Sequence, residues 1–413
     1  MRGLLFFSIL VFSLTVLAWV YVRDDSPPWD EDLQPEQPSV SAVIPQAPAR
    51  LHLALDSASP PSSPDLMLRS PWEWDTPSLS HLVAENAHAS DNLKDLLSED
   101  DWQPAHPAWK VRDMSGHEHW RALGVAREAA VAYYSRRGQD DVAMQAGLEL
   151  AALAKRLQSI EAWPGYYSRG AELHERACKA IATLLRQTRI DPASLEQMQA
   201  DFERHAPSAN VLRERLNGYY QFEHRLIIGS HPGDPWDQPA AGLMADHPNR
   251  LFFKPNKTLA LFATSLRELK DQAVKGPAVA SSQIVRRIGP QGRPTGVPGG
   301  PNRSGMRYAN ERIWRYASLV DYLSLQRARH ALVLTLFGAR RYALEHGIAP
   351  KTLNDLVPGY FTALPTDPYT SEPVRYDAAR GLIYSVGMDF KPQGGHGGEE
   401  PLADDNEPTV MVR

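Results

Sequence analysis

The residues best suited to chemistry gather in one irregular stretch of the sequence, between positions 224 and 247. This stretch holds three histidines and three aspartates: His224, His231, Asp234, Asp237, Asp246 and His247. Imidazole and carboxylate groups can bind a divalent metal ion or act as a general base. The same residue types also cap turns in surface loops. The stretch therefore leaves two interpretations open, a metal-dependent hydrolytic site and a structural loop.

A tighter cluster, His117-Glu118-His119, has the residue types of a zinc site but not the spacing. Side chains at i and i+2 of a helix point about 200° apart, so one helix cannot bring both histidines to one ion. Zinc hydrolases of the H-E-x-x-H type place their histidines at i and i+4. We therefore expect an exposed helix start here rather than a zinc site.

Other chemical motifs are sparse. The single cysteine, Cys178, excludes an intrachain disulfide and a cysteine-rich zinc module. Because it lies among alanines in a helical pattern, we expect a packed, inert thiol. The sequence has no phosphate-binding glycine loop and no nucleophile elbow. Its net charge of −5 is too small to mark a nucleic-acid-binding surface, so we expect no nucleic-acid partner. The absence of an assembled catalytic set favours a protein without enzymatic activity.

Helical periodicity dominates the part of the chain that would position these residues. One apolar stripe steps by three or four residues along Val142, Ala146, Leu150, Leu153, Leu157 and Ile160. Asp191-Pro192 is typical of an N-cap followed by proline at the first helical position. Short polar breaks predict about five helices between 115 and 228, stacked as antiparallel hairpins. A tetratricopeptide repeat is not supported, because only Trp120, Leu123 and Gly124 fit its pattern.

The first residues predict a membrane anchor. Residues 3–22 carry no charge, and about 20 apolar residues in a helix cross a bilayer core of roughly 30 Å. Trp19 and Tyr21 lie at the far end, where aromatic rings prefer the interface. A cleaved signal peptide, with Val16-Leu17-Ala18 at its cleavage site, is the alternative interpretation. In both cases we expect the body on the periplasmic side of a bacterial inner membrane, and in the first case a single-pass protein.

Composition divides the chain into six segments. The predicted segments are a transmembrane anchor at 1–23, a Pro/Asp-rich spacer at 24–80, a helical domain at 81–275, a Gly/Pro-rich linker at 276–304, a long helix plus small β-hairpin module at 305–390 and an acidic tail at 391–413. The predicted fold class is mainly α, with a helical-hairpin array after a single N-terminal transmembrane helix. A small α+β module follows at the C-terminal end.

The C-terminal module has a characteristic order of motifs. Pro350 is followed by Leu364-Pro365-Thr366-Asp367-Pro368, then by Tyr376 and Tyr384-Ser385-Val386-Gly387, with Asp389 two residues further on. This order resembles the C-terminal part of the major pseudopilins of type II secretion. The stretch is also similar to tails of uncharacterised membrane-anchored bacterial proteins with helical middles.

The resemblance implies a pseudopilin-like α+β end with a calcium-binding loop. Asp389 matches a ligand position of that loop, and Asp404 and Asp405 would supply further oxygens. The N-terminus departs from the family, because with Gly3 at the cleavage site Ser8 stands where pseudopilins carry a glutamate. The long helical region between anchor and module is a second departure.

An anchor, a spacer and a helical array together favour a membrane-anchored scaffold or protein-interaction protein of the bacterial envelope. Its expected partners are the lipid bilayer, through residues 3–22, and an unidentified protein. Two alternatives remain open: a pseudopilus-associated secretion component, and a metal-dependent hydrolase that uses the 224–247 loop. Apart from calcium, no cofactor is expected.

Overall fold

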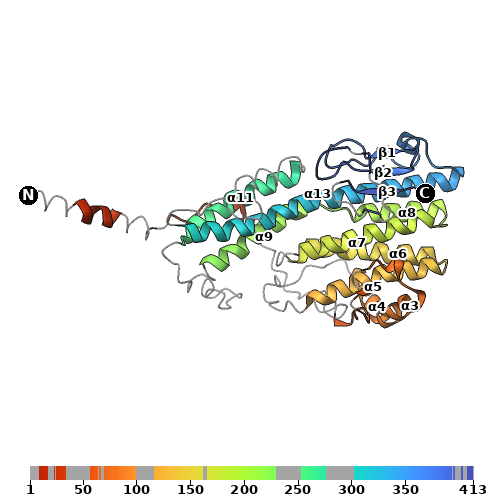
Figure 1. Cartoon of the computed structure of the whole chain (residues 1–413), viewed down its shortest axis with the longest axis horizontal. Helices are drawn as coiled ribbons and strands as arrows, with labels where there is room; N and C mark the ends of the chain where they lie inside the picture. Colours follow the sequence, from red (N-terminus) through yellow and green to blue (C-terminus); the bar gives the residue numbers. More distant parts are fainter. Residues whose placement is uncertain are drawn as a thin grey trace, which may run out of the picture. The chain divides into compact units, whose positions relative to one another are not determined.

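The computed structural model describes the following residues: 9–16, 23, 25–33, 56–63, 65–66, 69–98, 116–160, 165–228, 253–275, 302–392, 394–395, 401–402 and 407–412. Within them the fold is mainly helical, with one three-stranded sheet near the C-terminal end (Figure 1). This confirms the predicted fold class at that level. The chain forms two compact units, described separately below: a smaller unit of residues 1–38 and 212–320, and a larger unit of residues 39–211 and 321–413.

Three long helices form the centre of the larger unit: α5 (Gly116–Arg136), α6 (Asp140–Ser159) and α7 (Gly165–Gln187). They pack against one another side by side (Figure 1). Short connections make consecutive helices antiparallel, as the sequence predicts. The predicted stripe of α6 is buried from Ala146 to Ile160, whereas Val142 is 47% exposed.

Helix α8 (Pro192–Arg204) adds a further apolar face to this core. Its predicted N-cap is confirmed, because the Asp191 carboxylate accepts hydrogen bonds of 3.1 and 3.0 Å from the backbone amides of Ala193 and Ser194. Phe202, near the end of α8, is fully buried. The amphipathic pattern of this short helix therefore places an aromatic ring in the interior of the unit.

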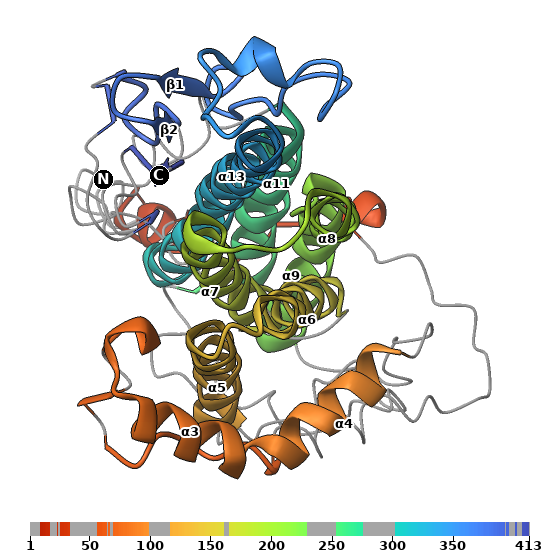
Figure 2. The same cartoon turned by 90° about the vertical axis from the view of Figure 1, so that its right-hand side faces the viewer.

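Two shorter helices flank this core: α3 (Thr76–Glu85) packs on α5 on the side away from α7, and α4 (Ala87–Leu97) packs against α6 and α3 (Figure 2). The short 3₁₀ helix η3 (Pro71–Glu73) precedes them and also packs on α5. Arg136 of α5 donates hydrogen bonds of 2.6 Å to the backbone carbonyls of Trp72 and Trp74. The predicted spacer of 24–80 is thus folded from Pro71 onward, because two tryptophans supply the apolar surface that the neighbouring prolines and serines lack.

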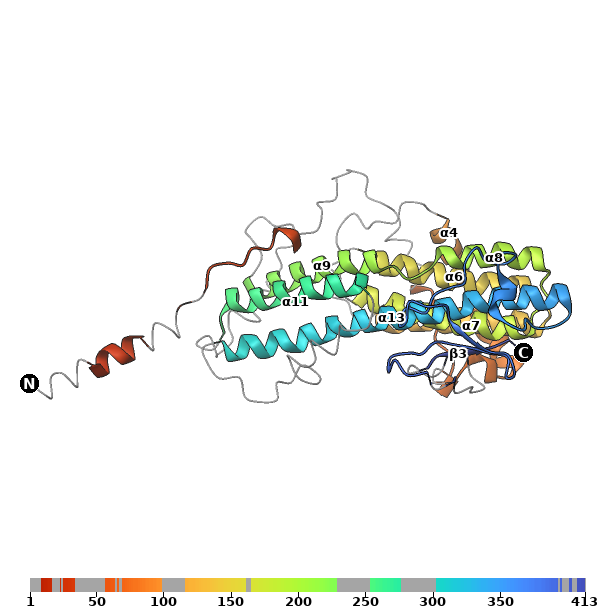
Figure 3. The same cartoon turned by 90° about the horizontal axis from the view of Figure 1, so that it is seen from above.

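The smaller unit contains three helices among the described residues: α9 (Ala209–Ile228), α11 (Pro255–Lys275) and the first part of α13 (Arg303–His346). They run side by side (Figure 3). Tyr219 of α9 stacks on Tyr316 of α13 with ring centroids 5.1 Å apart. Phe262 of α11 meets Tyr308 of α13 edge to edge at 6.1 Å. Aromatic contacts therefore tie both helices to α13.

A second piece of the predicted spacer packs in the smaller unit. The 3₁₀ helix η1 (Glu31–Leu33) buries Leu33 completely. The Asp32 carboxylate accepts hydrogen bonds of 2.6 and 2.8 Å from the guanidinium of Arg267 in α11. Arg267 also lies over the ring of Trp29, 5.0 Å from its centroid. Residues 29–33 of the predicted spacer are therefore folded against α11.

Helix α13 is continuous over 44 residues, about 66 Å at 1.5 Å per residue. The sequence predicts a helix from about 306 to 346 that could break near Gly338, and no break is present. Glycine is needed at 338 for another reason, since a Cβ there would lie 2.3 Å from the Phe361 ring. The predicted stop is confirmed: Gly347 has a positive φ of 73° directly after the last turn.

The C-terminal module packs a small antiparallel sheet and a short 3₁₀ helix beside α13. Its elements are η7 (Leu353–Leu356), β1 (Arg375–Asp377), β2 (Leu382–Tyr384) and β3 (Thr409–Met411). Strand β2 is central, with Ile383 opposite Tyr376 on one side and Val410 on the other. The hairpin of β1 and β2 is the one that the sequence predicts.

The last described part of the segment predicted as an acidic tail is folded. Residues 407–412 pack as part of the module rather than extend into solvent: Glu407, Val410 and Val412 are only 1–2% exposed. A two-stranded hairpin is marginal in water, and a third strand with an apolar face stabilises it. The predicted linker of 276–304 lies outside the described residues apart from 302–304, where α13 begins.

The predicted membrane anchor falls mostly outside the described residues. Residues 9–16 are helical and exposed. No helix in the described parts of the chain is both long enough and apolar enough to cross a bilayer.

Candidate functional site

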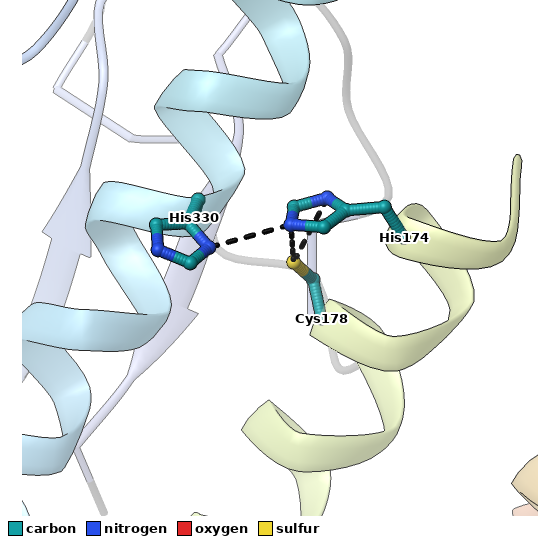
Figure 4. Close-up of side chains that lie close together, drawn as sticks. All are labelled: His174, Cys178 and His330. Atoms are coloured by element: carbon teal, nitrogen blue, oxygen red, sulfur yellow. Dashed lines mark hydrogen bonds between the residues drawn. The ribbon is translucent and has the colours of Figure 1, made fainter. Parts of the chain in front are cut away.

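Two histidines and the single cysteine converge inside the larger unit (Figure 4). His174 and Cys178 lie one turn apart on α7, and His330 faces them from α13. The Nε2 atom of His174 lies 3.3 Å from Nδ1 of His330. The Sγ atom of Cys178 lies 3.7 Å from Nδ1 and 3.9 Å from Nε2 of His174. One potential ligand atom from each residue falls within 4.8 Å of the other two.

Apolar rings enclose this cluster. Phe202 of α8 stacks on His330 with centroids 4.3 Å apart and on His174 at 6.4 Å. Phe337, two turns further along α13 than His330, contacts Phe202 at 5.9 Å. His174, Cys178 and His330 are at most 4% exposed. Three groups with polar atoms are therefore held in a dry part of the core, where polar groups are costly unless they have partners.

Burial fixes the protonation of the cluster. It lowers the pKa of His174 to about 3 and lowers the pKa of His330 well below its usual value, with nearby histidines adding to both shifts. Burial also raises the pKa of the Cys178 thiol. Both imidazoles are therefore neutral at pH 7, which is the form in which histidine binds metal ions. The Nε2 atom of His330 has no hydrogen-bond partner among the described residues.

An ion pair between a buried arginine and a partly buried glutamate lies next to the cluster. Arg329 is 2% exposed and lies 2.9 Å from the carboxylate of Glu175. Tyr322 donates a hydrogen bond of 2.6 Å to the same carboxylate. Burial acts to raise the pKa of Glu175, but Arg329 and the bond from Tyr322 lower it overall. Glu175 is thus ionised and balances the charge of Arg329.

A second feature of the larger unit is a surface pocket of about 470 Å³ between α3, α4, α5 and α6. Tyr133 and Tyr134 line it with edge-to-face rings 5.3 Å apart. The guanidinium of Arg137 lies over the Tyr133 ring, 5.4 Å from its centroid, and donates a 2.6 Å hydrogen bond to its phenol. Arg127 and Glu149 form a buried ion pair in its wall. A pocket of this volume can hold several side chains of a partner.

The structure brings together few of the residues that the sequence analysis singles out. Of the 224–247 group, His224 lies on α9 with its ring 6.2 Å from Tyr220. The other five members lie outside the described residues, as do the side chains of His117 and Glu118. The predicted hydrolytic site therefore stays a prediction.

The predicted calcium site also stays a prediction. The Asp389 carboxylate accepts a hydrogen bond of 2.9 Å from the backbone amide of Lys391. Asp404 and Asp405 lie outside the described residues. Asp367, part of the motif that resembles pseudopilins, is 1% exposed and accepts hydrogen bonds of 2.9 Å from the amides of Tyr369 and Val386. It joins the two halves of the motif and has a structural role.

Sequence reasoning missed the cluster of His174, Cys178 and His330. The i, i+4 spacing of His174 and Cys178 was the available signal, because it places both on one helix face. His330 follows 156 residues after His174, and no local pattern links residues that far apart. The prediction that Cys178 is packed is confirmed by its complete burial.

No protein-family model, no curated protein and no solved structure matches this chain. The predicted resemblance to pseudopilins therefore stays a prediction from the sequence motifs of the C-terminal module.

Proposed function

We propose that this protein is a scaffold of the bacterial envelope, anchored in the inner membrane through residues 3–22, whose helical region binds a protein partner. The observation that carries the proposal is the pocket between α3, α4, α5 and α6, with Tyr133, Tyr134 and Arg137 at its surface. Tyrosine and arginine are the residue types that most often contribute binding energy at protein interfaces. The exposed Val142 adds an apolar contact at the same place.

A photo-crosslinking experiment on the full chain in its native membrane tests the proposal. A photoreactive phenylalanine replaces Tyr133 in the pocket or, as a control, the exposed Arg307 of α13. We expect one discrete adduct from position 133 and none from position 307. Adducts from both positions, or from neither, contradict the proposal.

Two exposed valines supply a matched pair of variants for the same assay. Val142 lines the pocket, whereas Val274 of α11 does not, and they are 47% and 51% exposed. Val142→Asp should lower the adduct yield by about 10-fold, because a desolvated carboxylate in an interface costs more than 1.4 kcal/mol. Val274→Asp should leave the yield unchanged.

The predicted anchor is tested by carbonate extraction of membranes. The full chain should stay in the membrane fraction, and a chain without residues 3–22 should be released. Release of the full chain excludes an anchored scaffold.

A pseudopilus-associated role is the second candidate function. Asp367 supports it, because this residue of the Leu364–Pro368 motif binds the amide of Val386 and so links the motifs that resemble those of pseudopilins. This role predicts removal of the leader after Gly3. An intact Met1 in the mass spectrum of the native membrane protein contradicts it.

A further inference from the structure

We infer that His174, Cys178 and His330 form a binding site for one monovalent copper ion, Cu(I). The inference is independent of the scaffold role proposed above, because the pocket near Tyr133 and the cluster share no residue.

The separations already approximate those around a bound ion. With metal–nitrogen bonds of about 2.0 Å and a metal–sulfur bond of about 2.3 Å, two nitrogens stand about 3.3–3.5 Å apart and nitrogen and sulfur about 3.5–3.7 Å apart. The cluster has 3.3 Å between Nε2 of His174 and Nδ1 of His330. It has 3.9 Å between the same Nε2 and the Cys178 sulfur. The third separation, between His330 and the Cys178 sulfur, lies within 4.8 Å, so the sulfur has to move closer to the imidazoles when the site closes.

The cluster is poorly satisfied without an ion. A hydrogen bond between the two imidazoles uses one nitrogen of each ring, and the thiol lies too far from both nitrogens for a strong bond. Phe202, the neighbour of both rings, offers no polar atom. Core positions of this kind normally carry apolar side chains, because buried polar groups cost free energy. A bound ion would offset that cost for the three ligand groups.

Coordination number favours copper over zinc. Within the described ranges, the cluster contains three ligand residues and no fourth His, Cys, Asp or Glu. Structural zinc sites are almost always four-coordinate, whereas soft thiolate ligands select Cu(I), and two histidines with one cysteine form a recurrent trigonal copper set. The stacked ring of Phe202 covers His330 and keeps water away from that side.

The charge balance of the site also favours Cu(I). Arg329 and Glu175 neutralise each other, and an imidazole that binds a metal ion does so in its neutral form. When copper binds, Cys178 releases its proton to solvent as the copper–sulfur bond forms, and the thiolate carries one negative charge. A monovalent ion then leaves the site neutral, but a divalent ion leaves one uncompensated positive charge in a dry core, which is strongly unfavourable.

Anaerobic titration of the purified full chain with Cu(I), against a chromophoric Cu(I) chelator, tests the inference. We expect uptake of one ion per chain, a near-ultraviolet thiolate-to-copper absorption band, and an X-ray absorption spectrum with one sulfur and two nitrogen scatterers. Failure to take up one equivalent, or a spectrum without sulfur, overturns the site.

Matched variants assign the ligands. Cys178→Ala and His330→Gln should each weaken Cu(I) binding by at least 100-fold. His346→Gln changes an exposed histidine of the same helix and should bind Cu(I) like the parent chain. Unchanged affinity in Cys178→Ala overturns the inference. Circular dichroism shows whether a variant folds, and the X-ray absorption spectrum of the parent chain decides the question where one does not.

A parallel titration with Zn(II) and Co(II) checks the choice of ion. We expect neither to compete with an equimolar amount of Cu(I) at the site. If Zn(II) binds more tightly than Cu(I) through Cys178, the assignment to monovalent copper is wrong.

Discussion

The phenol of Tyr316 donates a 2.5 Å hydrogen bond to Oε1 of Glu223, a carboxylate with no exposed surface in the smaller unit. Tyr308 donates a 2.6 Å bond to the other oxygen, and Arg312 lies 3.6 Å away. Burial and the neighbouring carboxylate raise the pKa of both phenols, so both remain donors throughout the ordinary pH range. One acidic residue thus joins α9 to two turns of α13.

Removal of that acid should destabilise the smaller unit. Glu223→Ala leaves the buried phenol of Tyr316 and the half-buried phenol of Tyr308 without this acceptor, and we expect the free energy of unfolding to fall by about 3 kcal/mol. Urea unfolding followed by circular dichroism measures the change. Glu311→Ala, at a 49% exposed side chain with an ion pair to Arg307, should change stability by less than about 0.5 kcal/mol. Equal effects of the two substitutions contradict this account.

Two helix glycines should respond to alanine in opposite directions. A Cβ at Gly170 would lie 2.5 Å from the carbonyl oxygen of Ala154 and 2.9 Å from the backbone nitrogen of Gln158, so α7 and α6 would have to separate. Gly218 of α9 has open space around the same position. We expect Gly170→Ala to destabilise the chain by about 2 kcal/mol and Gly218→Ala to stabilise it by up to about 1 kcal/mol. Thermal unfolding of both variants checks the signs, and a stabilised Gly170→Ala variant would refute the close approach of the helices.

Strand β3 should control the stability of the sheet. Val410 is 1% exposed and lies opposite Ile383 of the central strand. Val410→Asp buries a charge without a partner, and we expect β3 to detach. Hydrogen exchange of the β2 amides should then accelerate by more than 10-fold. Ile348→Asp, at a 55% exposed side chain outside the sheet, is the control and should leave exchange in β2 unchanged.

Stability should decrease on mild acidification, partly through His205. Burial first, and then the positive charges of Lys155, Arg204 and Arg156, lower its pKa in the folded state to about 4. In the unfolded chain the pKa is about 6.5. Between these values the unfolded state binds a proton that the folded state does not. The free energy of unfolding therefore falls as the pH decreases from about 6.5 to about 4, and the contribution is constant above about 6.5.

Histidine variants separate the contribution of His205 to the pH dependence of stability from the contributions of other groups. His205→Gln should lose less stability between pH 7 and pH 4.5 than the parent chain, as measured by urea midpoints. Some loss remains, because burial also lowers the pKa values of His174 and His330. His88→Gln, at an exposed position of α4, should behave like the parent chain. If His205→Gln loses as much stability as the parent, His205 does not supply the effect.

Local sequence signals predict the helices well and the packed loops poorly. The cap at Asp191, the stop at Gly347 and the stripe of α6 depend on neighbours within one or two turns, so spacing alone reveals them. The folding of η1 and η3 depends on distant partners, Arg267 and Arg136. Composition cannot show such partners, and proline-rich segments therefore look uniformly extended in the sequence.

The copper site illustrates the same limit for chemistry. Cys178 lies among alanines in its own helix, and its burial confirms that it is packed in the core. His330 reaches it from a helix far along the chain, and only the folded structure reveals that two imidazoles face the sulfur. Local density of acidic residues and histidines in a sequence is a weaker guide to a site than convergence of side chains in space.

Residues 212–320 interrupt the larger unit in the chain, and this insertion affects how fast that unit can assemble. An open loop of this length must lose entropy before α7 meets the second part of α13. The stacking of Tyr219 on Tyr316 joins the two ends of the inserted segment. Once it forms, the effective loop shrinks about tenfold, which lowers the closure barrier by about 2 kcal/mol. Early folding of residues 212–320 would thus accelerate the packing of α7 against the second part of α13, the step that brings His174 to His330.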